Sequence, residues 1–121
     1  MVTKKCLVIN DHTSKYPEPI TLEKGAPLTV GEKYEGAEGW DNWFYCETPG
    51  QKGGWVPGQI IEIIHDRIAR ARENYTAREL TVKEGDVLIA LRNLNGWAWC
   101  ENPSNLESGW VPQANLQDVS E

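Results

Sequence analysis

The feature that most constrains the fold is an internal repeat. Motifs spread over most of the chain occur twice, in the same order. Three segments of the first half have a counterpart in the second half, and the first copy carries six extra residues between Gly25 and Trp43. The matched segments are ITLEKG (20–25) with LTVKEG (80–85), WFYCE (43–47) with WAWCE (97–101), and GWVP (54–57) with GWVP (109–112). Insertions concentrate in loops, so we predict two copies of one small domain, residues 1–64 and 68–121. Each copy would lie near the lower size limit of an independent fold.

Within each copy, apolar residues alternate with polar ones over short segments that end at turn-forming residues. In the second copy, Trp97 and Trp99 are expected on one face of a strand, with Ala98 and Cys100 on the other. Repeated segments of this kind predict an all-β protein of two consecutive, five-stranded barrels. Residues 65–67 would remain as a very short linker. The core is expected to contain Leu22, Cys46, Val56, Val82, Cys100 and Val111.

The stretch between the two copies has a second interpretation. Ile61, Ile64 and Ile68 recur at nearly helical spacing, which is typical of an amphipathic connecting helix over residues 60–75. The repeat instead assigns these residues to the last strand of the first copy and the first strand of the second.

Charge and composition exclude several classes of function. Twelve basic and eighteen acidic residues give a net charge of −6, which repels phosphate and anionic lipid, so we expect neither a nucleic acid nor a membrane partner. No apolar stretch is long enough to span a membrane and the first residues are too polar for a secretory signal, so we expect a cytoplasmic protein. Cys6, Cys46 and Cys100 lack metal-ligand spacing and are expected to be buried thiols, with no cofactor.

Catalysis is not indicated. His12 and His65 are the two histidines of the chain, the residue type best suited to act as a general base near neutral pH. The repeat places no nucleophile beside either of them, so we expect a protein that is not an enzyme. Six tryptophans exceed what two small cores need, and the surplus favours a binding surface.

The repeated motifs resemble those of Src-homology-3 (SH3) domains of the variant or bacterial type, over nearly the whole chain. In the second copy, ARENY (71–75) is similar to the ALYDY segment of the family, ELTVKEGD (79–86) to ELSFxxGD, GWAWC (96–100) to GWWxA, and GWVP (109–112) to its glycine–aromatic–Val–Pro segment. The first copy shows the pattern more faintly, with VINDH (8–12) and PITLEKGA (19–26). The resemblance implies two SH3-like barrels.

What the resemblance implies for function is an aromatic groove that binds an extended, proline-containing or basic peptide. The implied ligand-binding residues are Tyr75, Glu79, Trp97, Trp110 and Pro112 in the second copy, and Trp43, Trp55 and Pro57 in the first. The second groove is the better candidate, although Glu73 and Asn115 replace two of its tyrosines. In the first copy, Asn10, His12, Pro19 and Ile60 replace the two ALYDY tyrosines, the acid and the last tyrosine, with Tyr16 or Glu18 as partial substitutes.

Other functions stay open beside peptide binding. The tandem would be a structural or assembly protein if its tryptophan faces packed between domains or on a larger partner. A cage of Trp40, Trp43 and Tyr45 would bind a methylated cation by cation–π attraction. Binding to the bacterial cell wall, known for another SH3-like subfamily, would require export. The oligomeric state is not indicated by the sequence.

Overall fold

The computed structural model describes residues 4–15, 17–36 and 40–119, and its regular structure is β-strand with two short 3-10 turns. The strands are β1 (Lys4–Val8), β2 (Thr21–Leu22), β3 (Pro27–Lys33), β4 (Trp43–Glu47), β5 (Gly54–Pro57), β6 (Ile61–His65), β7 (Ile68–Ala71), β8 (Tyr75–Thr76), β9 (Val87–Leu94), β10 (Trp97–Glu101), β11 (Ser108–Pro112) and β12 (Leu116–Asp118). The turns η1 (Gly58–Ile60) and η2 (Gln113–Asn115) precede β6 and β12. The predicted all-β class, with two five-stranded sheets, is confirmed. Among the described residues, no helix has the length and hydropathy that crossing a membrane requires.

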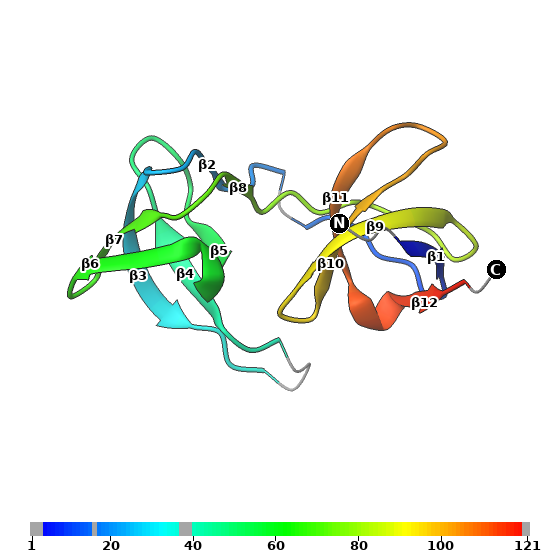
Figure 1. Ribbon diagram of the computed structural model, residues 1–121, viewed down its shortest axis with the longest axis horizontal. Helices are drawn as coiled ribbons and strands as arrows, with labels where there is room; N and C mark the ends of the chain where they lie inside the picture. The colour runs from blue at the N-terminus through cyan, green and yellow to red at the C-terminus, as the bar shows by residue number, and fades with distance from the viewer. Residues whose placement is uncertain (1–3, 16, 37–39, 120–121) are drawn as a thin grey trace. The chain divides into compact units, whose positions relative to one another are not determined.

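One compact unit, here called the split unit, combines Met1–Pro17 with Glu79–Glu121. Its sheet has the order β11-β10-β9-β1-β12, so the first strand of the chain lies between two strands from its second half (Figure 1). The pairing is antiparallel, with Cys6 opposite Leu88 on one side and Asp118 on the other. The core of this unit contains Cys6, Val8, Leu80, Val82, Leu88, Ala90, Ala98, Cys100 and Val111.

The other compact unit, here called the continuous unit, is the segment Glu18–Arg78. Its sheet has the order β5-β4-β3-β7-β6, and the short strands β2 and β8 pair with each other (Figure 1). Its buried apolar residues include Ile20, Leu22, Leu28, Cys46, Val56, Ile60, Ala69 and Ala71. The six core residues predicted from the repeat are all buried, three in each unit.

The two copies of the repeat exchange their first strands between these units. Strand β1 opens the first copy but pairs with β9 of the second, whereas β7 opens the second copy but pairs with β3 of the first. The compact units therefore do not coincide with the predicted domains, 1–64 and 68–121, although each holds one full set of five strands. The chain passes from one unit to the other twice, after Pro17 and after Arg78.

The short connection between β6 and β7 explains the exchange. Of residues 65–67, predicted as a linker, His65 ends β6, and Asp66 and Arg67 form the turn of a β-hairpin in which Ile63 lies opposite Ala69. Asp66 has a φ of 52°. Antiparallel strands joined by so short a turn pair with each other, so β7 follows β6 into the continuous unit and takes the place beside β3. Strand β1 then completes the other sheet. The connecting helix considered over residues 60–75 is wrong for the same reason.

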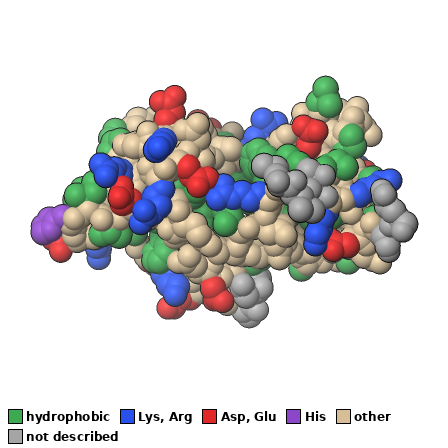
Figure 2. All heavy atoms as spheres, in the orientation of Figure 1, with side chains coloured by type: hydrophobic (Ala, Val, Ile, Leu, Met, Phe, Trp, Pro, Cys, Tyr) green, Lys and Arg blue, Asp and Glu red, His purple; other side chains and the backbone are tan. Residues whose placement is uncertain are grey.

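The surface mixes charges of both signs with scattered apolar groups. On the face shown in Figure 2, Lys and Arg side chains lie between Asp and Glu side chains. Hydrophobic side chains also lie around the end of the β6–β7 hairpin, where Ile63, Ile64 and Ile68 are each more than half exposed.

Candidate functional site

The strand exchange redistributes the residues predicted for the two grooves. Glu79, Trp97, Trp110 and Pro112 lie in the split unit, whereas Tyr75 lies in the continuous unit. The continuous unit also holds the three residues predicted for the first groove, Trp43, Trp55 and Pro57. The residues predicted for a groove in the continuous unit therefore come from both copies of the repeat.

His12 and Glu79 form a close polar pair among the residues predicted for the groove of the split unit. Nε2 of His12 lies 2.8 Å from Oε1 of Glu79, and the two side chains are only 12% and 10% exposed. The His12 ring packs edge-on against Trp97, with the ring centroids 5.5 Å apart and the planes at 79°. Two backbone hydrogen bonds between His12 and Val82 hold the loop after β1 in place. His12 thus stands beside Trp97, where the resemblance had placed Tyr75.

Trp110, a second predicted groove residue of this unit, is buried and held in place by its neighbours. The backbone N–H of Leu80 donates to the carbonyl oxygen of Trp110 at 3.1 Å. Gly109 permits this close approach, because a Cβ at that position would lie 2.7 Å from the backbone nitrogen of Leu80. The Trp110 ring meets the ring of Trp99 at 5.3 Å and 73°. Since Trp110 is 5% exposed, it supports the groove more than it offers surface to a ligand.

Pro112 is the last residue of β11, and Asn115 is the last residue of η2, which follows it. Pro112 is buried and lies opposite Trp97 across the β10–β11 pair. Nδ2 of Asn115 donates to the backbone oxygens of Asn10 at 3.3 Å and Asp11 at 3.1 Å. The family has a tyrosine at this position. In this chain the Asn115 amide stands there and links η2 to the loop after β1 by hydrogen bonds.

Of the groove candidates in the continuous unit, Tyr75, Trp43 and Pro57 are buried, whereas Trp55 is partly exposed. The hydroxyl of Tyr75 donates to the carbonyl oxygen of Trp55 at 3.0 Å, and Tyr75 itself is 7% exposed. Trp43 and Pro57 lie opposite each other across the β4–β5 pair, and both are buried. Trp97 of the split unit keeps a partly exposed ring, whereas its counterpart Trp43 does not.

Four aromatic side chains form a chain of ring contacts in the continuous unit, here called the aromatic row. Trp40 meets Tyr34 at 5.9 Å, Tyr34 meets Trp55 at 5.3 Å, and Trp55 meets Tyr45 at 5.5 Å. Trp55 and Tyr45 are cross-strand partners in the β4–β5 pair. Tyr34, which follows β3 directly, was not predicted from the sequence. The general excess of aromatic residues was the one sequence signal that pointed to it.

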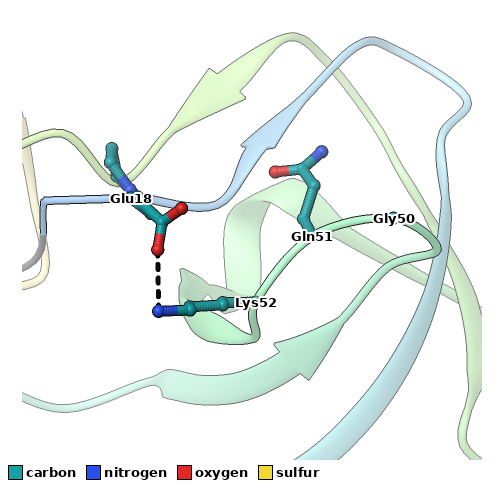
Figure 3. Close-up of a pocket in the computed structure, with 5 residues that line it drawn as sticks. Glu18, Gly50, Gln51 and Lys52 are labelled. Atoms are coloured by element: carbon teal, nitrogen blue, oxygen red, sulfur yellow. Dashed lines mark ion pairs between the residues drawn. The ribbon is translucent and has the colours of Figure 1, made fainter.

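A polar hollow of about 490 Å³ also lies in the continuous unit, lined by Glu18, Pro19, Gly50, Gln51 and Lys52 (Figure 3). Nζ of Lys52 lies 2.7 Å from Oε2 of Glu18, and this hydrogen bond, with the Lys52 charge, lowers the pKa of the Glu18 carboxyl. The side chain of Gln51 is bonded to both the N–H and the carbonyl oxygen of Thr21. The Glu18 carboxylate is thus paired with Lys52 of the same unit. Tyr16, the other residue suggested as a partial substitute in the first groove, lies outside the described residues.

The three cysteines are buried thiols, as predicted. Burial raises the pKa of Cys46 to about 11 and that of Cys100 to about 12. Burial, and then the charge of Asp118, raises the pKa of Cys6. The thiolate is the nucleophilic and metal-binding form, so these raised pKa values keep the thiols inert at neutral pH. In the described part of the chain, no three His, Cys, Asp or Glu side chains are grouped as metal ligands.

Comparison with known proteins identifies one family. The model of the variant SH3 domain matches the chain twice, over residues 5–64 and 67–119. Comparisons with curated proteins and with solved structures give no match. SH3 domains are generally protein-interaction modules, and SH3-like domains are typically not catalytic. Because the two matches cover nearly the whole chain in the order that its repeated motifs predicted, the protein belongs to the variant SH3 domain family, as a tandem of two SH3-like domains.

Proposed function

We propose that the split unit binds an extended, proline-containing peptide in the groove formed by His12, Glu79, Trp97, Trp110 and Pro112. The observation that supports this proposal best is the partly exposed ring of Trp97, which is held edge-on by His12. A fixed aromatic ring suits a polyproline II ligand, which is already extended and loses little entropy on docking. This groove is built mainly from the second copy of the repeat, with His12 in place of Tyr75.

The engagement of Glu79 favours prolines over a basic side chain as the main anchor. Its carboxylate lies 2.8 Å from His12 and is 10% exposed. A ligand arginine would have to displace His12 or share this carboxylate with it, and separating a partly buried, hydrogen-bonded pair costs free energy. We therefore propose that proline rings packing on Trp97 supply most of the affinity.

A weak complex is expected. Each well-packed aromatic anchor contributes roughly 1–2 kcal/mol, and ordering the peptide offsets part of this gain. With only Trp97 and its immediate neighbours available, we expect a Kd on the order of 10–100 µM, which corresponds to about −5.5 to −7 kcal/mol.

Titration with a ten-residue peptide that carries a Pro-x-x-Pro core tests the proposal. We expect the indole N–H signal of Trp97 to shift in ¹H–¹⁵N spectra, and Trp97→Ala to raise the Kd about tenfold or more. Tyr45→Ala, in the continuous unit, is the matched control and should leave the Kd unchanged. The proposal fails if the wild-type protein gives no spectral response to a panel of such peptides at millimolar concentration.

A second function, assembly on a larger partner without short-peptide binding, is favoured by the burial of Trp43 and Trp110. These rings are 6% and 5% exposed, so they offer little area to a short ligand. This alternative predicts that the peptide titration gives no response and that acrylamide quenches the tryptophan fluorescence only weakly. Strong quenching together with a shift at Trp97 would favour the peptide-binding groove.

A further inference from the structure

We propose that two copies of the chain exchange the first strand of the split unit, so that residues 4–15 of one copy complete the sheet of the other. The place between β9 and β12 is then a binding site for a strand, and its occupant is this segment, supplied by the same chain or by a second copy. The inference does not depend on peptide binding. It rests on how residues 4–15 are held within the split unit.

Residues 4–15 are bound through their backbone, in the way that an added strand is bound. Strand β1 lies between β9 and β12 and pairs antiparallel with both. After it, the backbone N–H of Val8 donates to the carbonyl oxygen of Asp86 at 2.9 Å, and His12 exchanges two backbone hydrogen bonds with Val82. The same segment of a second copy would form the same bonds.

The segment also completes the core and the polar surface of the split unit. Cys6 and Val8 are 3% and 0% exposed and belong to its core cluster. The carboxylate of Asp11 accepts a hydrogen bond from the backbone N–H of Glu84 at 2.6 Å. Without the segment, β12 would lose the strand that joins it to β9. Because unpaired strand edges are templates for pairing, an opened split unit re-forms its sheet with whichever copy of the segment it meets.

The continuous unit stays intact when the split unit opens. Its five-stranded sheet and the β2–β8 pair are formed by the segment Glu18–Arg78 alone. Release of residues 4–15 is therefore a local opening, which costs less free energy than unfolding of the whole chain. Exchange can thus proceed between chains that remain half folded.

Charge complementarity favours this occupant. Residues 4–15 contain three lysines and one aspartate, whereas residues 79–119 contain six acidic and two basic residues. Nζ of Lys4 lies 3.5 Å from Oδ2 of Asp118 on β12. The strand site therefore attracts the segment, although two whole copies, each with a net charge of −6, repel each other.

An exchanged dimer has side chains of two copies around Trp97. His12 lies 2.8 Å from Glu79 and packs edge-on against Trp97. In the dimer, the His12 at this place belongs to one copy, while Glu79 and Trp97 belong to the other. The surroundings of Trp97 are therefore completed by a second chain.

Protein concentration decides which form predominates, because the monomer and the exchanged dimer contain the same contacts within each unit. Return of the segment to its own unit is favoured by its effective concentration, which is on the order of millimolar for a short flexible connection. The fraction of chains in exchanged dimers should therefore rise with protein concentration and become appreciable at about 1 mM.

The test mixes two variants of the full chain, Leu7→Cys and Val87→Cys. Leu7 lies opposite Val87 in the antiparallel pair of β1 with β9, where Cα atoms are about 4.5–5.5 Å apart, so a disulfide can form. Neither variant can form this bond within one chain. The mixture is held in reductant at a urea concentration below the unfolding midpoint, so that split units open and close, and is oxidised after the urea is removed. At about 1 mM protein, we expect the mixture to give about fivefold or more covalent dimer than either variant alone.

Two controls make the outcome specific. Leu7→Cys and Val87→Cys combined in one chain should close the disulfide within the monomer at low protein concentration. Leu7→Cys mixed with Glu23→Cys, an exposed position of the continuous unit, measures random cross-linking. The inference is overturned if the combined variant closes its disulfide while the mixture gives no more covalent dimer than the random pair.

The unmodified chain provides a second measurement, which needs no disulfide. After the same urea treatment at about 1 mM protein, size-exclusion chromatography with light scattering should show a dimer. This dimer should dissociate slowly on dilution, because dissociation requires a split unit to open. A chain that stays monomeric throughout would also overturn the inference.

Discussion

The strand exchange can be tested by asking which core residue is coupled to Val8. Val8 of β1 is fully buried and belongs to the same cluster as Leu88 of β9. Leu28 of β3 occupies the matching position in the continuous unit and is 3% exposed. Val8→Ala removes about two methylene equivalents, or roughly 1.6 kcal/mol of transfer free energy. The cavity that remains raises the expected loss of stability to about 2–3 kcal/mol.

A double-mutant cycle then distinguishes exchanged from sequential first strands. Because Val8 and Leu88 belong to one core cluster, the free energies of unfolding lost in Val8→Ala and Leu88→Ala should deviate from additivity by about 0.5–3 kcal/mol. Val8→Ala and Leu28→Ala should be additive within about 0.5 kcal/mol, since they lie in separate units. Urea unfolding followed by tryptophan fluorescence measures all the variants. Coupling of Val8 to Leu28, with none to Leu88, would refute the exchange.

Three further predictions follow from the fold. A fragment of residues 18–78 should give dispersed amide signals in NMR spectra, because it contains all the strands of one sheet. A fragment of residues 1–64 should not give dispersed signals. The reverse result would contradict the observed topology. Gly85→Ala should lower the free energy of unfolding, measured in urea, by about 1–2 kcal/mol, because φ is +97° at this position. No neighbouring atom lies within 4 Å of the added Cβ, so the loss comes from backbone conformation alone. A loss near zero would contradict this reasoning. Burial raises the pKa of Cys46 from 9.0 to about 11 and that of Cys100 from 9.0 to about 12. Between these values the folded state keeps two protons that the unfolded chain loses. The free energy of unfolding should therefore fall as pH rises from about 9 toward 12. Replacing both cysteines by alanine should flatten that fall relative to the wild type.

The motifs were sufficient to predict the strands and the core. Trp97 and Trp99 alternate with Ala98 and Cys100 in the sequence, and the burial of these residues alternates in the same way. Local patterns of this kind depend on which face of a strand meets the core, and each copy of the repeat carries that information in full.

The repeat did not predict which first strand enters which sheet. In β1 the buried Cys6 and Val8, and in β7 the buried Ala69 and Ala71, alternate with more exposed residues, so either strand could cover the same place beside β3 or β9. The outcome depends on the short turn at Asp66 and Arg67 and on pairings distant in sequence. For the same reason the contact between His12 and Glu79, which are 67 positions apart, could not be predicted.

The topology also sets an order in which the nascent chain can acquire structure. Strand β1 is synthesised well before its final neighbour, β12, with Cys6 opposite Asp118. At about 5–20 residues per second, β1 waits several seconds or more for that partner. During part of that wait, the edge of β3 that β7 will later cover is already available. During translation, the unexchanged pairing of β1 with β3 is thus possible first. Formation of the β6–β7 hairpin then has to compete with that pairing for the edge of β3.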